Sequence, residues 1–146
     1  MAQFILQAAA IPVYNGMLCL ISTRNKKRWI VPKGHINPEQ SPAEAALQEA
    51  WEEAGLLGAV DAEPLGRYVY EKSASLFQVT VFLMHVHQEI EDFPESLSRQ
   101  KIWLPFQDAV NRLHDPQLQK IAQGILFNNR NIVISKIPLA APLYAS

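Results

Sequence analysis

The sequence has one cysteine, no long apolar run and almost no net charge. Because Cys19 has no partner in the chain, a disulfide framework is excluded, and its position in the apolar run 17–21 predicts a buried strand residue in a reducing compartment. No apolar stretch approaches the roughly 18 residues that span a bilayer, and the first residues lack the basic region of a signal peptide. These absences predict a cytoplasmic protein with no membrane partner.

The balance of charge limits the classes of ligand. The chain has 13 Lys and Arg against 14 Asp and Glu, a formal net charge of −1. Nucleic-acid binders carry a broad basic surface, so we expect no nucleic-acid polymer as partner, and any polyanion must be bound locally. The chain has 146 residues, 49% of them hydrophobic, which is enough for one core. We therefore expect a single domain, 1–146, and leave open whether it forms a homodimer.

The N-terminal third predicts strands. Two apolar runs between residues 3 and 22 are separated by Tyr14, Asn15 and Gly16, and an Asn-Gly pair between such runs is a strong hairpin signal. A basic loop, 24–28, then leads to the short apolar segment 29–31, which ends at Pro32-Lys33-Gly34-His35, interpreted as a loop.

A helix is predicted from residue 42 to residue 54. Ser41 is an N-cap residue, Pro42 suits the first helical position, and Glu44 completes a capping box. Gly55 is typical of the residue that ends a helix. The alanine-rich sequence between them favours the helical state.

The second half predicts further strands and one more helix. Two strands, 65–72 and 76–87, flank Ser73-Ala74-Ser75, and a third, 101–104, ends at Pro105. After it, Asp115 and Pro116 signal a helix start, followed by an apolar stripe at helical spacing. The last twenty residues predict no element. Strands with few helices indicate an α/β or α+β fold around a mixed sheet.

Three acidic residues share one face of the first helix. Glu49, Glu52 and Glu53 are three and four residues apart, so their carboxylates converge and repel unless a cation is present. Oxygen ligands of this charge suit Mg²⁺ or Mn²⁺. Taken alone, such a helix is more often a solvated acidic face.

The surroundings favour the metal site. The segment from Gly34 to Leu56 resembles the Nudix box, G-x5-E-x7-R-E-U-x-E-E-x-G-U, where U is a bulky aliphatic residue, and the spacing is kept over all 23 positions. The matching positions are Gly34, Glu49, Glu52, Glu53, Gly55 and Leu56. The resemblance implies a Nudix-like sandwich of a mixed β-sheet between helices.

Three positions depart from this pattern. Gln40 replaces a glutamate, Gln48 replaces an arginine, and Ala50 is smaller than the usual aliphatic residue. In the family the arginine orients the adjacent metal-binding glutamate. Gln48 could hydrogen-bond Glu49 without bringing charge, and Glu39 could partly replace the lost glutamate. These changes concern the catalytic rate more than the fold.

The resemblance implies that Glu49, Glu52 and Glu53 are metal ligands and catalytic residues, and that water attacks a phosphorus atom of a nucleoside diphosphate-like substrate with Mg²⁺ or Mn²⁺ as cofactor. A general base is also required. Glu52 is our first candidate. The alternatives lie in a distal acidic loop: Glu89, Glu91, Asp92 and Glu95.

A local basic cluster indicates a substrate with several phosphates. Arg24, Arg28 and Lys33 are the candidate phosphate-binding residues, with Lys26 and Lys27 beside them, although such loops are as often ordinary solvated turns. Residues 28–36 are similar to the same segment in Nudix branches that cleave dinucleoside polyphosphates and diphosphoinositol polyphosphates. We therefore expect a polyphosphorylated small molecule as the partner.

For two other patterns, a histidine pair and a set of aromatic residues, we favour a structural role over a functional one. His85 and His87 share a strand face, but no third nitrogen or sulfur ligand is placed by spacing, so a metal pair is disfavoured. The aromatic residues Tyr68, Tyr70, Phe77 and Phe82 could stack on a base, with core packing the favoured interpretation. A catalytically weakened sensing or partner-binding module on the same fold, and a structural protein with an accidental acidic helix, remain the alternatives to an enzyme.

Overall fold

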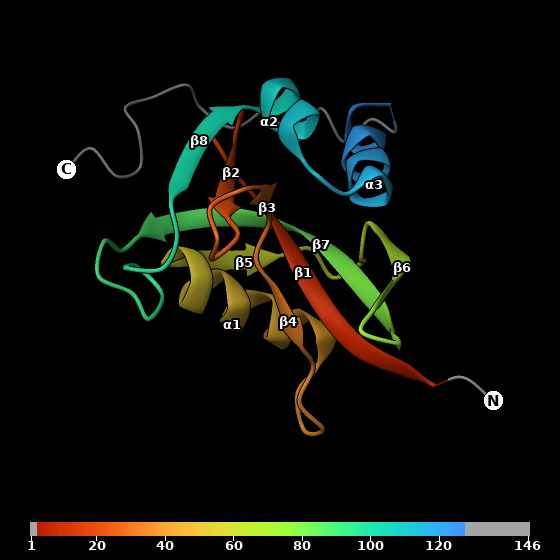
Figure 1. Ribbon diagram of the computed structural model, residues 1–146. Helices are drawn as coiled ribbons and strands as arrows, with labels where there is room; N and C mark the ends of the chain where they lie inside the picture. Colours follow the sequence, from red (N-terminus) through yellow and green to blue (C-terminus); the bar gives the residue numbers. More distant parts are fainter. Residues whose placement is uncertain (1–2, 128–146) are drawn as a thin grey trace.

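The computed structural model describes residues 3–127 (Figure 1). The last twenty residues of the chain thus lie, apart from residue 127, outside the described residues. The strands are β1 (Phe4–Tyr14), β2 (Met17–Ser22), β3 (Trp29–Ile30), β4 (Lys33–His35), β5 (Leu56–Val60), β6 (Gly66–Lys72), β7 (Ser75–Glu89) and β8 (Lys101–Pro105). The helices are α1 (Pro42–Ala54), α2 (Phe106–Arg112) and α3 (Pro116–Phe127).

One mixed sheet forms the centre of the fold, as predicted. β1 and β7 run parallel in a continuous register from Phe4 opposite Leu76 to Val13 opposite His85. The other paired strands are antiparallel: β2 and β4 pair with β1, β5 and β6 with β7, and β3 and β8 with β2. The sheet therefore places β4, which leads to α1, beside the central strand β1.

The helices cover both faces of the sheet (Figure 1). Four alanines of α1 at 0% exposure pack with Met84 and Leu56 on one face: Ala45, Ala46, Ala50 and Ala54. Residues of α2 and α3 pack with Ile11 and Leu83 on the other face. This is the expected sandwich of a mixed sheet between helices, and Cys19 lies buried within it. None of the helices within residues 3–127 is long and apolar enough to span a bilayer.

The predicted ends of α1 are confirmed. The Ser41 hydroxyl accepts a hydrogen bond from the Glu44 backbone N–H at 3.1 Å, and the Glu44 carboxylate accepts one from the Ser41 N–H at 2.8 Å. Gly55 ends the helix with φ +68°, a conformation that favours glycine. A side chain there would also collide with Phe93, so the strand after α1 begins at a fixed point.

Local signals also set the hairpins and α3. Asn15 and Gly16 both have positive φ and join β1 to β2, as predicted. Ser73 and Ala74, at φ 52° and 64°, make the turn between β6 and β7. The Asp115 carboxylate accepts hydrogen bonds from the first N–H groups of α3, which confirms it as the start of that helix.

The sequence interpretation was wrong or silent at three elements. Residues 33–35, interpreted as a loop, form β4 because they pair with residues 7–9 of β1. The strand β5 was not predicted, since Gly58 interrupts its apolar pattern at a bulge against β7. The helix α2 precedes the predicted α3 and is too short to show a clear helical period.

Candidate active site

The carboxylate of Glu49 packs directly against the backbone of β4. A Cβ atom at Gly34 would lie 2.5 Å from both carboxylate oxygens of Glu49, closer than van der Waals contact permits. The β4 pairing with β1 fixes Gly34, and the caps of α1 fix the helix that carries Glu49. Gly34 thus leaves the space that the Glu49 carboxylate occupies, which gives this box glycine a direct function.

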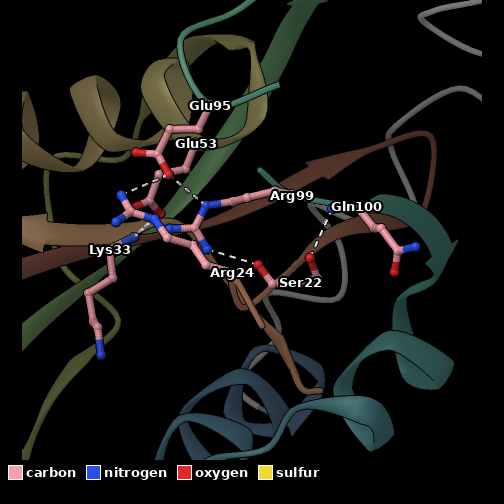
Figure 2. Close-up of polar contacts among 7 residues, drawn as sticks. All are labelled: Ser22, Arg24, Lys33, Glu53, Glu95, Arg99 and Gln100. Carbon is pink, nitrogen blue, oxygen red and sulfur yellow. Dashed lines mark hydrogen bonds and ion pairs between the residues drawn. The ribbon is translucent and has the colours of Figure 1, made fainter. Parts of the chain in front are cut away.

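Glu53 lies one helical turn further on and is buried, with 7% of its surface exposed. Its Oε1 accepts a hydrogen bond from the Lys33 backbone N–H at 3.1 Å. Its Oε2 lies 3.3 Å from a terminal nitrogen of Arg99 (Figure 2). A buried carboxylate is stabilised by such charged and N–H partners, so the orientation of Glu53 is fixed from two sides.

Glu52 has a different environment. Its Oε1 accepts a hydrogen bond from the Gln48 side-chain amide at 3.1 Å, and Gln48 in turn accepts one from the Gln40 amide. The expectation that Gln48 bonds Glu49 was therefore wrong, because consecutive residues point about 100° apart on a helix while residues four apart are neighbours. The two glutamines that depart from the box pattern thus form a chain of hydrogen bonds, from Gln40 to Gln48 and from Gln48 to Glu52.

The distal acidic loop reaches the site through Glu95. The Glu95 backbone N–H donates to the Glu52 carbonyl at 3.0 Å, which attaches this loop to the last turn of α1. The Glu95 Oε1 lies 2.9 Å from Arg99 Nε and 3.3 Å from a terminal nitrogen of Arg24 (Figure 2). Glu95 is therefore the distal-loop candidate that the fold brings to the box glutamates.

The other candidates from that loop have different surroundings. Glu89 is 94% buried at its side chain, pairs with Lys101 at 2.8 Å and accepts a hydrogen bond from the Trp103 indole at 3.0 Å. Glu91 and Asp92 are exposed. Within residues 3–127, none of the three forms a hydrogen bond or ion pair with the box glutamates, which weakens their candidacy as the general base.

Two box glutamates have perturbed acidity. Burial raises the pKa of Glu53 to about 8, against the opposing effects of Arg99 and the Lys33 N–H. Burial, followed by the charge of Glu52, also raises the pKa of Glu49, which lies one helical turn before Glu53 on α1. A carboxylate whose pKa is raised by burial holds its proton more tightly, and a cation that binds there can replace this proton.

A cavity of about 890 Å³ opens beside Glu53. All three predicted phosphate-binding residues, Arg24, Arg28 and Lys33, line it, together with Arg99 and Lys72. The rest of its lining mixes two kinds of side chain. The aromatic and apolar ones are Trp29, Ile30, Val31, Tyr68, Tyr70, Leu113 and Leu118, and the polar or acidic ones are Gln7, Thr23, Asn25, Glu53, Glu71, His114 and Asp115. The cavity therefore offers basic side chains that can bind phosphate groups and aromatic side chains that can pack against a planar ring.

Of the four aromatic candidates, Tyr68 and Phe82 are buried in the core, at 6% and 4% exposure, whereas Tyr70 and Phe77 are only partly buried. Tyr68 and Tyr70 line the cavity, and Tyr70 stacks on Phe77 with ring centroids 4.9 Å apart. The Lys33 ammonium lies 4.2 Å from the Tyr70 ring centroid. Phe82 is buried in the core on the α1 side, which confirms the packing interpretation for that residue.

The described residues contain no preassembled group of three or more His, Cys, Asp or Glu side chains that could hold a metal ion. Glu49 and Glu53 lie one helical turn apart on α1, whereas the Glu52 carboxylate accepts its hydrogen bond from Gln48. His85 pairs with Asp61 at 2.8 Å. The donor set of the box, oxygen atoms of clustered carboxylates, nevertheless has the chemistry that hard divalent cations require.

Comparisons with known proteins place the chain in a family. The NUDIX domain family model matches residues 5–124. Diphosphoinositol polyphosphate phosphohydrolase 3-alpha of Mus musculus is 34% identical over 137 residues, covering 86% of this chain and 80% of that protein. Diphosphoinositol polyphosphate phosphohydrolase 2 of Homo sapiens is 30% identical, covering 84% of this chain and 71% of that protein.

The fold agrees with these matches. The crystal structure of C. elegans Ap4A hydrolase superimposes with a TM-score of 0.68 at 18% identity, covering 87% of this chain and 99% of that one. This chain belongs to the NUDIX family. It is a Nudix pyrophosphohydrolase, an enzyme class that generally uses divalent metal ions.

Sequence reasoning missed Arg99 and the carbonyl of Ser22, which accepts a hydrogen bond from Arg99 at 2.8 Å. No periodicity or motif marks Arg99, which lies in a polar segment before a strand. Its contact with Ser22 joins residues 77 positions apart, so only the folded chain shows it.

Proposed function

We propose that this enzyme hydrolyses a phosphoanhydride bond in a nucleoside diphosphate linked to another moiety, with a dinucleoside polyphosphate as the first candidate substrate. The observation that carries the proposal is that Glu53, the buried glutamate of the box, lines a cavity that basic residues also line, with the partly buried Glu49 one helical turn before it. Carboxylates bind divalent cations and basic side chains bind phosphates, so both parts of a metal-phosphate complex have partners.

Mg²⁺ or Mn²⁺ is the proposed cofactor, with Glu49, Glu52 and Glu53 as ligands. When bound, such an ion polarises the phosphoryl oxygens and lowers the pKa of a coordinated water. Glu52 would have to release its Gln48 partner, which requires only rotation of a partly exposed side chain. The raised pKa values of Glu49 and Glu53 support the fit, because a cation offsets the charge that burial penalises.

The remaining roles fall to side chains around this centre. Glu52 stays our first candidate for the general base, and Glu95 becomes its alternative from the distal loop because it lies next to Arg99 and Arg24. Arg24, Arg28 and Lys33 bind the phosphates that are not attacked. Arg24 would exchange its ion pair with Glu95 for a phosphate, which its 72% exposed side chain permits.

Two observations bear on the substrate. The partly buried rings of Trp29 and Tyr70 in the cavity suit stacking with a nucleobase and support a dinucleoside polyphosphate. The basic residues that line the cavity support a diphosphoinositol polyphosphate as the second candidate, as do the names of the relatives at 30 to 34% identity. The cytoplasmic location and the absence of nucleic-acid and membrane partners stay predictions from the sequence, and whether a homodimer forms stays open.

The substrate is tested by measuring hydrolysis of diadenosine polyphosphates, nucleoside triphosphates, ADP-ribose and diphosphoinositol polyphosphates with Mg²⁺ or Mn²⁺. We expect kcat/KM to be highest for a diadenosine polyphosphate. Replacing the partly buried Trp29 by Ala should raise KM for that substrate more than for a diphosphoinositol polyphosphate, which lacks a base. Binding of these compounds without any turnover would support the sensing module that Gln40 and Gln48 made an alternative.

Metal binding should release protons. Since the pKa of Glu53 is raised to about 8, the folded protein keeps a proton there at pH 7 that the unfolded chain has lost. The metal-free fold is therefore favoured at low pH, and this contribution is lost as pH rises through about 8. We expect Mn²⁺ affinity to increase from pH 6 to pH 8, because the ion competes with this proton.

Isothermal titration of Mn²⁺ at pH 7 in two buffers of different ionisation enthalpy measures the release directly. The apparent binding enthalpy should differ between the buffers for wild type and for the exposed-site control Glu63→Gln. An enthalpy independent of the buffer, with tight binding, would show that no proton is displaced and would contradict the raised pKa of Glu53.

A further inference from the structure

Arg99 is the most extensively bonded cation beside the box. It lies in the loop before β8, and 8% of its side chain is exposed. Its guanidinium donates to Ser22 O at 2.8 Å and to Glu95 Oε1 at 2.9 Å, and lies 3.3 Å from Glu53 Oε2 (Figure 2). A buried guanidinium with three such partners is held in one orientation.

The backbone around Arg99 is fixed as well. The Gln100 N–H donates to the Ser22 hydroxyl at 2.9 Å, and the Ser22 N–H donates to the Gln100 carbonyl at 2.9 Å. At the other end of the loop, the Glu95 N–H donates to the Glu52 carbonyl. The segment from Glu95 to Gln100 is thus attached to β2 and to α1, so it can hold a side chain at a defined place.

Arg99 joins two acidic groups that come from separate parts of the chain. Glu53 belongs to α1 and Glu95 to the distal loop, and their charges repel each other. The planar guanidinium offers donors in a rigid fork, so two carboxylates bound to it keep a fixed separation. A lysine ammonium would supply the charge but not this geometry.

Arg24 provides an internal contrast. It approaches the same Glu95 oxygen at 3.3 Å, but 72% of its side chain is exposed, and among the described residues Glu95 is its one ion-pair partner. An exposed pair of this kind contributes little and exchanges readily with solvent or ligand. The two arginines that pair with Glu95 therefore differ: the Arg99 side chain is held in one orientation, whereas Arg24 can exchange its Glu95 partner for solvent or a ligand.

We propose that Arg99 is a positioning residue that holds the carboxylates of Glu53 and Glu95 at the separation required for metal binding and catalysis. This inference rests on the proposed function of the box glutamates. Arg99 acts through those two carboxylates, although it lies at the edge of the substrate cavity. Arg99 lies outside the box, which ends at Leu56.

The test compares Arg99→Lys and Arg99→Met with the matched control Arg112→Met, which removes an exposed arginine on α2. Mn²⁺ affinity is measured by titration without substrate, and kcat and KM are measured separately. For Arg99→Lys we expect Mn²⁺ affinity to fall about 10-fold or more. We expect kcat to fall about 100-fold, with KM changed by less than about 3-fold.

Each other outcome has a defined meaning. A rise in KM alone would make Arg99 a substrate-binding residue and overturn the inference, as would a lower melting temperature with unchanged kcat and Mn²⁺ affinity. If the Arg99 variants do not fold, the Glu95→Gln variant replaces them, because the Glu95 side chain is 20% exposed and its substitution is easier to tolerate. Normal kcat and normal Mn²⁺ affinity in Glu95→Gln would also overturn the inference. A wild type that neither binds Mn²⁺ nor hydrolyses any substrate would instead refute the proposed function.

Discussion

Replacing Glu52 by Gln should reduce kcat at least about a thousandfold while the fold is retained. The change removes one negative charge from the proposed metal site and abolishes the candidate general base, and a loss of about 4 kcal/mol of transition-state stabilisation corresponds to this factor. Glu52 is half-buried and its partner is a neutral amide, so no buried cation is left unpaired. Initial rates at saturating substrate and metal measure the effect.

The control is Glu63→Gln, which removes the same charge from an exposed position between β5 and β6. It should keep the wild-type kcat. If Glu52→Gln also retained kcat within about 3-fold, a change of less than about 1 kcal/mol in transition-state stabilisation, the box would not be the catalytic centre.

Replacing Gly34 by Ala should cause the second largest loss of activity, with little loss of stability. The new Cβ would occupy the place of the Glu49 carboxylate, whose end is flexible enough to move aside. The fold should therefore lose little stability, but a carboxylate displaced by about 1 Å can cost about 100-fold in rate. We expect weaker Mn²⁺ binding and a matching fall in kcat.

The control for this substitution is Gly66→Ala, where the added Cβ would make ordinary contact with Ile121 at 3.5 Å. Urea unfolding of both variants separates stability from activity. A Gly34→Ala enzyme with normal kcat and Mn²⁺ affinity would show that Glu49 does not work from its position against β4.

Features encoded by neighbouring residues could be predicted. The caps of α1 depend on Ser41, Glu44 and Gly55, and the hairpin turn depends on Asn15 and Gly16, so spacing along the chain was sufficient. The same holds for the glutamates of the box, because residues three and four apart on a helix are neighbours.

Features that depend on distant residues could not be predicted. β4 is three residues long and exists because β1 lies beside it, and the Arg24 to Glu95 pair joins positions 71 apart. The orientation of Glu52 was also beyond the sequence, since it depends on whether Gln48 turns towards residue 49 or residue 52. Helical spacing places carboxylates on a face but does not choose their rotamers.

The most direct test of the account is the position of Mn²⁺ in a crystal of the wild-type protein, located by its anomalous scattering. We predict a peak about 2 Å from carboxylate oxygens of Glu49 and Glu53, with Glu52 turned away from Gln48 to join them. No peak at these residues, or a peak only at His85 and Asp61, would contradict the central claim that the glutamate face of α1 is the metal site.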